Sequence, residues 1–174
     1  SGATSFNQDI SNWDVSNVKN MDYMFSGASS FNQPLGNWDV SNVKTMFGMF
    51  SDVTSIGIVA FVGTYEYNRA GSTSFNQPIG NWDVSNVETM TYMFSGATSF
   101  NQDISNWNMS NIQDTSSMFN GATSFNQPIG NWNVSNVNEM MDMFYNAELS
   151  IENYDNLLIG WSQLNLIEGV IFDG

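Results

Sequence analysis

The sequence predicts an α/β solenoid, a stack of about five coils that each hold one short parallel strand and one short helix, closed by a C-terminal cap. Three observations predict it: a repeat of 25 residues, a change of hydrophobic period within each repeat, and a different apolar segment after the last repeat. One strand and one helix in so few residues cannot bury a core alone. The repeats must therefore stack to form a continuous core.

The repeat is marked by the string Ser-Phe-Asn-Gln. Its phenylalanines are Phe6, Phe31, Phe75, Phe100 and Phe125. The steps between them are 25, 44, 25 and 25 residues, so one interval carries 44 − 25 = 19 extra residues. We therefore divide a single solenoid domain, 1–174, into repeats over 1–51 and 71–148, an insertion over 52–70 and a C-terminal cap over 149–174.

Each repeat changes its hydrophobic period midway. In the first repeat, polar residues alternate with apolar ones over 10–15, which predicts a short strand with Trp13 and Val15 pointing inward. Apolar residues then follow at i, i+3, i+6 and i+7 over 18–25, which predicts a helix of about two turns. Gly27 is placed to end that helix, because glycine tolerates positive φ.

Stacking turns every repeat position into a column of equivalent residues about 4.8 Å apart. We expect the Trp and Met columns to lie in the core. The asparagine columns that begin at Asn7, Asn12 and Asn17 are expected to bond the backbone of neighbouring coils and one another.

One column is acidic. Asp14, Asp39 and Asp83 are expected to point outward on consecutive strands, and Asn108 and Asn133 take the same position in the last two repeats. Carboxylates about 5 Å apart repel each other by roughly 0.8 kcal/mol in water, so cations or hydrogen-bond donors must lie between them. Oxygen ligands suit Ca²⁺, and we hypothesise a calcium site along this column. A solvated acidic face ranks ahead of this hypothesis, because no D-x-D-x-D-G loop is present; no other cofactor is required.

The insertion over 52–70 holds the most apolar stretch of the chain. Insertions in solenoids project from one face and often bind, so Phe61, Tyr65, Tyr67 and Arg69 form a candidate binding surface. The alternatives are a lid folded back on the stack and a degenerate sixth coil, which together weigh as much as the binding surface.

Outward positions of the predicted helices also carry apolar residues, which could line a second contact surface: Tyr23, Phe47, Tyr92 and Met141. Self-association as a homodimer through this face or through the insertion is a further hypothesis.

The cap begins with a predicted helix after Ser150. Ile151, Tyr154, Leu157 and Trp161 stand at helical spacing. A final strand is expected over 170–172. Such a segment covers the open edge of the core, as the terminal unit of a repeat array must.

Charge and composition exclude several functions. The net charge is −14, with 17 acidic and 3 basic residues, which argues against nucleic acid as a partner. The absence of Cys and His excludes thiol nucleophiles, Ser-His-Asp triads and zinc bound by these residues. No stretch approaches 18 consecutive apolar residues, so no direct membrane insertion is expected.

The spacing Ile10-x-x-Trp13-x-Val15 is similar to the L-x-x-L-x-L signature of leucine-rich repeats. More closely, the string F-N-Q-x-I-x-N-W-x-V-S-N-V-x-x-M-x-x-M-F resembles the bacterial surface-protein repeats grouped with BspA-like leucine-rich repeats. The resemblance implies a fragment of a larger secreted or cell-surface bacterial protein, which works in adhesion or recognition. It implies no shared catalytic activity and no particular site residues.

The leading interpretation is a non-catalytic extracellular adhesion or recognition module that binds a protein or glycan on a surface, or itself. A structural spacer within a large surface protein is the alternative. A glycosidase that uses Asp14, Asp39 and Asp83 is remote, because these carboxylates lie on a regular column and not across a cleft with two different environments.

Overall fold

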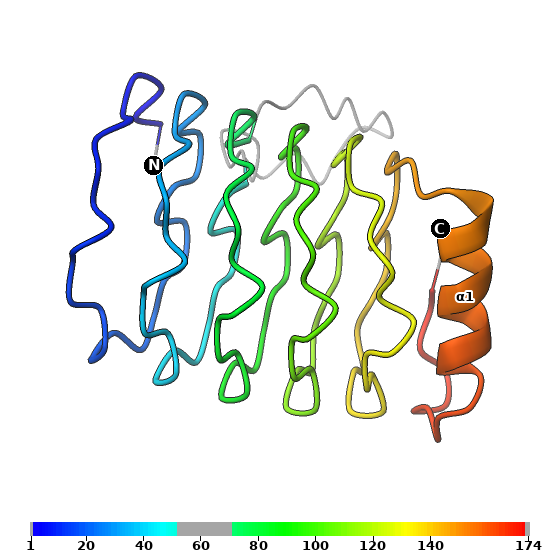
Figure 1. The fold of residues 1–174 in the computed structure, drawn as a ribbon. Coiled ribbons are helices and arrows are strands. Elements are labelled where there is room, and N and C mark those ends of the chain that lie inside the picture. Colours follow the sequence, from blue (N-terminus) through cyan, green and yellow to red (C-terminus); the bar gives the residue numbers. More distant parts are fainter. Residues whose placement is uncertain (1, 52–70, 173–174) are drawn as a thin grey trace, which may run out of the picture.

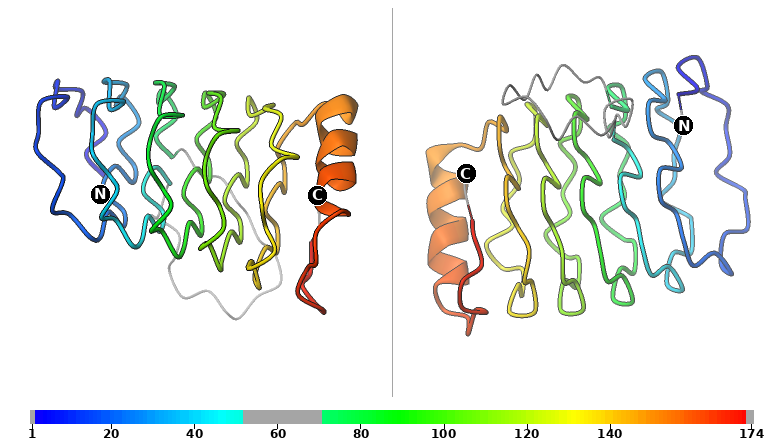
Figure 2. Two further views of the ribbon diagram at one scale, coloured as in Figure 1. Left: turned by 60° about the horizontal axis from the view of Figure 1, so that its bottom comes forward. Right: turned by 180° about the vertical axis from the view of Figure 1, so that it is seen from behind.

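The computed structural model describes residues 2–51 and 71–172. The repeats lie side by side as successive loops of backbone, and a helix covers the C-terminal end of the row (Figures 1 and 2). This helix, α1, spans Ile151–Trp161. We number the repeats 1 to 5 by their first residues, which are Phe6, Phe31, Phe75, Phe100 and Phe125.

The predicted α/β solenoid of short parallel strands and short helices, similar to leucine-rich repeats, is wrong. Within residues 2–51 and 71–172, α1 is the only helix and no segment is a strand. In place of a sheet, isolated parallel bridges join each repeat to the next, and further backbone hydrogen bonds between neighbouring repeats accompany them. The bridges join Asn20, Thr45, Thr89, Asp114 and Glu139 in that order.

The helix predicted over 18–25 does not form because a residue inside it has a left-handed backbone. Tyr23 has φ 56°, which a right-handed helix cannot contain. The N–H groups of Tyr23 and Phe25 donate to carbonyls of the next repeat, Phe47 and Met49, each at 2.8 Å. The helix-like spacing of apolar residues instead follows from consecutive short turns, such as the bond from the Met24 N–H to the Met21 carbonyl at 3.3 Å.

The strand predicted over 10–15 is replaced by turns and side-chain bonds. The Trp13 N–H donates to the Ile10 carbonyl three residues earlier, at 3.0 Å, which closes a turn. Side chains then join the repeats: the Trp38 indole donates to the Ile10 carbonyl at 3.1 Å, and the Asn42 amide donates to the Ser16 carbonyl at 2.8 Å. These bonds connect neighbouring repeats, as backbone ladder bonds connect neighbouring strands in a sheet.

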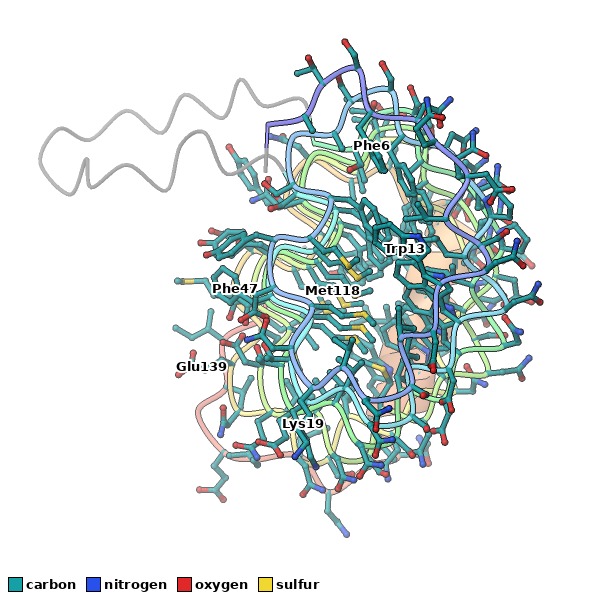
Figure 3. All side chains as sticks on the ribbon, turned by 90° about the vertical axis from the view of Figure 1, so that its left-hand side faces the viewer. Phe6, Trp13, Lys19, Phe47, Met118 and Glu139 are labelled. Carbon is teal, nitrogen blue, oxygen red and sulfur yellow. The ribbon has the colours of Figure 1, made fainter. Side chains whose placement is uncertain are left out.

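The core is built from columns of stacked rings and methionines (Figure 3). Two phenylalanine columns interleave. The ring centroid of Phe25 lies 4.1 Å from that of Phe31 and 5.4 Å from that of Phe50, the residue equivalent to Phe25 in the next repeat. The predicted inward Trp column is confirmed in repeats 2 to 5, where each Trp is at most 4 % exposed. Trp13 is 55 % exposed because no repeat packs over repeat 1 in this structure.

The predicted asparagine column is also confirmed. The Asn7 Oδ1 accepts from the Asn32 N–H at 2.9 Å and from the Gln33 amide at 3.0 Å. The same pattern recurs at each later repeat and ends where the Asn153 amide of α1 donates to the Asn126 Oδ1 at 2.8 Å. The ladder therefore runs through the array into the cap.

The cap begins with the predicted helix. Ser150 is its N-cap, with its hydroxyl accepting from the Asn153 N–H at 3.2 Å. Asn153, Leu157 and Trp161 follow one another at helical spacing, in the same order as the Asn, Ile and Trp of a repeat. Leu157 and Trp161 are buried, so one face of α1 covers the last repeat. The strand expected over 170–172 is absent.

Candidate functional site

The most distinctive outer feature of the described residues is a row of large side chains, which we call the aromatic stripe: Tyr23, Phe47, Tyr92 and Met141. The Phe47 ring lies 5.1 Å from that of Tyr23, edge to face, and 5.6 Å from that of Tyr92. Phe47 projects outward from the ribbon, on the side away from Trp13, whereas Met118 lies inside (Figure 3). The three rings are half-buried, and Met141 is 51 % exposed.

The backbone holds two of these rings at a cost. Tyr23 and Tyr92 have φ 56° and 58°, a left-handed conformation that costs a residue with a Cβ roughly 1–2 kcal/mol. The equivalent residues Gly48, Ser117 and Asp142 have the same conformation, with φ 55°, 54° and 57°, so it belongs to the turn of every repeat. A Cβ at Gly48 would lie 2.8 Å from two ring carbons of Tyr23, so the glycine makes room for that ring. The positions that the sequence placed outward on a helix are therefore outward, but on turns.

A carboxylate is fixed beneath the rings. The Asp22 Oδ1 accepts from the Thr45 hydroxyl at 2.6 Å and from the Phe47 N–H at 2.9 Å, while its Oδ2 accepts from the Asn20 amide at 2.9 Å. Burial raises the pKa of the Tyr23 hydroxyl, and Asp22 and Tyr92 add to this shift. Ionisation of the Tyr23 hydroxyl is therefore disfavoured.

Two further carboxylates lie along the same outer edge, and we call them the acid pair: Asp114 and Glu139. A parallel bridge joins these two residues directly. Glu139 is exposed and projects on the same side of the molecule as Phe47 (Figure 3). No basic side chain within 2–51 and 71–172 pairs with either carboxylate, since Lys44 pairs with Glu88, at 3.5 Å.

The row of large side chains is interrupted beside the acid pair. Repeat 4 carries Ser116 and Ser117 where repeats 2 and 3 carry Phe47 and Tyr92. Ser116 is partly exposed, and its N–H donates to the Asp114 Oδ1 at 2.8 Å. This Ser-Ser step has larger side chains in the repeats on either side of it.

The predicted Asp column is outward, but its carboxylates already have donors. The Asp39 Oδ1 accepts from the Ser41 N–H at 3.0 Å and from its hydroxyl at 2.6 Å, and Asp14 does the same with its own serine. Asp83 accepts the N–H of Ser85 at 3.0 Å. The hydrogen bonds to serine lower the pKa values of Asp14 and Asp39.

These bonds bear on the calcium hypothesis. The residues described here contain no group of three or more acidic side chains that could hold a metal ion. Serine donors within each repeat stabilise the carboxylates, which removes part of the reason for a cation between them. Calcium binding at Asp14, Asp39 and Asp83 stays a prediction, and melting with and without EDTA is its test.

The other predicted surface, Phe61, Tyr65, Tyr67 and Arg69, lies outside the described residues.

Apolar cavities lie at both ends of the row. One, of about 160 Å³, is lined by Phe6, Ile10 and Trp13 among others in repeat 1. The other, of about 260 Å³, lies between repeat 5 and the cap, where Met140, Trp161 and other apolar residues line it. Both continue the apolar core outward, and neither contains the aromatic stripe.

Sequence reasoning found the stripe but missed the acid pair. Asp114 and Glu139 occupy a repeat position that holds Asn or Thr elsewhere, so no motif marks them. Aligning the repeats and comparing charge at each column is the signal that could have found them.

Comparison with known proteins gives one family and no close relative. A family model described as "Mycoplasma protein of unknown function, DUF285" matches residues 1–70 and again 59–157. Searches of curated proteins and of solved structures found no match. No helix in the described parts of the chain is long and apolar enough to cross a membrane. Because the matched residues cover most of the sequence, the chain belongs to the DUF285 family of Mycoplasma proteins.

Proposed function

We propose that this chain is a non-catalytic recognition module of an extracellular bacterial protein, of the kind grouped with BspA-like surface proteins, and that it binds its partner through the aromatic stripe. The observation that carries the proposal is the row of rings on an outer face, in which Phe47 lies against both Tyr23 and Tyr92. Gly48 and Ser117 occupy the position of these tyrosines in other repeats with the same left-handed backbone, so the turn itself does not require a ring there. Exposed aromatic rings are also the side chains most enriched at recognition surfaces.

The array itself provides replacements for testing the stripe. Ser116 and Ser117 occupy in repeat 4 the positions of Phe47 and Tyr92, so Phe47→Ser with Tyr92→Ser copies a surface that the fold already contains. The labelled chain is applied to an array of immobilised glycans and cell-surface proteins. We expect saturable binding to a subset of the array, and at least a tenfold loss in the double variant.

A matched control is Asn108→Asp with Asn133→Asp, which extends the Asp column and leaves the stripe intact. This variant is expected to bind as the parent does. Absence of saturable binding to any surface ligand, or equal binding by the stripe variant, contradicts the proposal and favours the spacer interpretation.

A further inference from the structure

From the charges around the stripe we infer the chemistry of its partner: a protein segment that presents a Lys or Arg side chain to repeats 3 to 5. This inference rests on the proposed function. It specifies the charge of the partner and the repeats that the partner contacts. Its elements are Tyr92, the Ser-Ser step, the acid pair and Met141.

Within residues 2–51 and 71–172, no basic side chain pairs with the acid pair. Bridged residues in neighbouring repeats have close side chains, and like charges placed opposite one another are destabilising. In the Asp column each carboxylate accepts from a serine. In the acid pair, Asp114 accepts the N–H of Ser116, and the Glu139 carboxylate has no donor among residues 2–51 and 71–172. A cationic side chain of a partner would lower the repulsion between the two carboxylates.

The surroundings of the pair suit a long cationic side chain. Tyr92 offers a π-face in repeat 3, and Met141 offers an exposed apolar chain in repeat 5. Equivalent positions in successive repeats lie about 5 Å apart, so a group at the Ser-Ser step is within the roughly 6 Å over which cation–π attraction acts. The alkyl stem of Lys or Arg can pack on Met141 while its charged end reaches the carboxylates.

Charge along the row points the same way. Position 19 and its equivalents read Lys19, Lys44, Glu88, Gln113 and Asn138, so the two lysines belong to repeats 1 and 2. Asp114, Glu139 and Asp142 belong to repeats 4 and 5. The outer edge is therefore most acidic around the Ser-Ser step, which selects a basic segment over an acidic or neutral one.

The test must separate a local site from the general attraction of a chain with net charge −14 for any polycation. The probe is an octapeptide of alternating Gly and Arg, and a peptide with citrulline in place of every Arg is its neutral control. Glu139→Gln with Asp142→Asn removes two charges near the stripe. Asp14→Asn with Asp83→Asn removes two from the Asp column, where Asn already occupies the last two repeats.

By calorimetry at about 50 mM salt, we expect the arginine peptide to bind and the citrulline peptide not to bind. Glu139→Gln/Asp142→Asn and Phe47→Ser/Tyr92→Ser should each weaken binding at least fivefold, and Asp14→Asn/Asp83→Asn less than twofold. Equal weakening by the two charge variants, or unchanged binding by the aromatic variant, overturns the inference. If the chain binds a surface ligand that the arginine peptide does not displace, the inference fails while the proposed function stands.

Discussion

The indole N–H of each buried repeat tryptophan makes a bond that crosses to the preceding repeat. In repeat 3, Trp82 donates to the Leu35 carbonyl at 3.0 Å, and both groups are buried. Trp161 in α1 is buried as well, but its indole N–H has no hydrogen-bond partner among the residues that the structure describes. A tryptophan therefore contributes packing and a hydrogen bond to the preceding repeat in the array, whereas in the cap it contributes through packing.

This difference predicts unequal effects of one substitution. Trp82→Phe removes a donor from a buried carbonyl and should lower the free energy of unfolding by about 1–3 kcal/mol beyond the loss of ring volume. Trp161→Phe loses ring volume but no bond, so its loss should be clearly smaller. Urea unfolding followed by circular dichroism measures both, and equal losses would show that the indole bond contributes little.

The serine bonds of the Asp column predict a dependence on acid. Asp14 and Asp39 have pKa values below the ordinary 3.8 in the folded chain, because they accept from serine. A lowered folded pKa stabilises the fold above the unfolded value, and this stabilisation is lost as pH falls through the folded pKa. The loss should therefore occur below about pH 4.

Asn108 shows how to remove the charge and keep the bond, since its Oδ1 accepts from the Ser110 N–H at 3.1 Å. Asp14→Asn with Asp39→Asn should keep the melting temperature at pH 7 and flatten its fall between about pH 4 and pH 2. Melting followed across that range is the measurement. Parallel curves for the variant and the parent would rule out a contribution from these two carboxylates.

At the scale of elements, the sequence predicted which residues lie in the core and predicted the helix after Ser150. It did not predict how the backbone runs between the core residues. Val18, Met21 and Phe25 do pack against the core, as their spacing indicated. The same spacing arises from three-residue turns, and periodicity alone does not distinguish them from a helix. The left-handed conformation of Tyr23 rules out a helix here, and the sequence does not indicate it because aromatic residues rarely adopt this conformation.

The candidate site was predictable in part for the same reason. Outward positions such as Phe47 follow from the repeat, whatever the secondary structure. The pairing of Asp114 with Glu139 depends on which residue of each repeat forms the single backbone bridge. The hydrophobic pattern does not indicate which residue forms the bridge. In a turn, the residues on either side of the bridge residue can point inward or outward.

Packing of α1 on repeat 5 gives a prediction opposite to helix propensity. Gly160 lies inside α1, where Ala normally stabilises by about 0.5–1 kcal/mol. A Cβ at Gly160 would instead collide with the Gly130 carbonyl oxygen. Gly160→Ala should therefore lower the free energy of unfolding, by about 1–3 kcal/mol.

Ile159→Ala is the control, because Ile159 is 63 % exposed on the same helix and should change stability little. Thermal melting compares the two variants. A higher melting temperature for Gly160→Ala would mean that α1 does not pack as closely on Gly130 as the structure has it.

At the scale of the molecule, the described repeats form a row, and ring contacts join each repeat to its neighbours. An inner repeat has two such interfaces and a terminal one has one, so stability should differ along the row. Phe100 is fully buried among rings of repeats 3 and 5, whereas partly exposed Phe6 stacks on Phe31 alone. Phe100→Ala should cost about 3–5 kcal/mol, and Phe6→Ala less than half of that; urea unfolding checks both, and equal costs would contradict the nearest-neighbour account.

Amide exchange gives a sharper test, because the repeats supply matched bonds. The Tyr23 N–H donates to the Phe47 carbonyl at 2.8 Å, and the equivalent Tyr92 N–H donates to the Ser116 carbonyl at 3.0 Å. Judged by bond length alone, the Tyr23 amide would exchange no faster than the Tyr92 amide. If repeat 1 opens by breaking one interface while repeat 3 must break two, Tyr23 exchanges faster, by about tenfold or more. Hydrogen exchange by NMR at neutral pH measures the ratio, and equal rates would mean that the array opens as one cooperative unit.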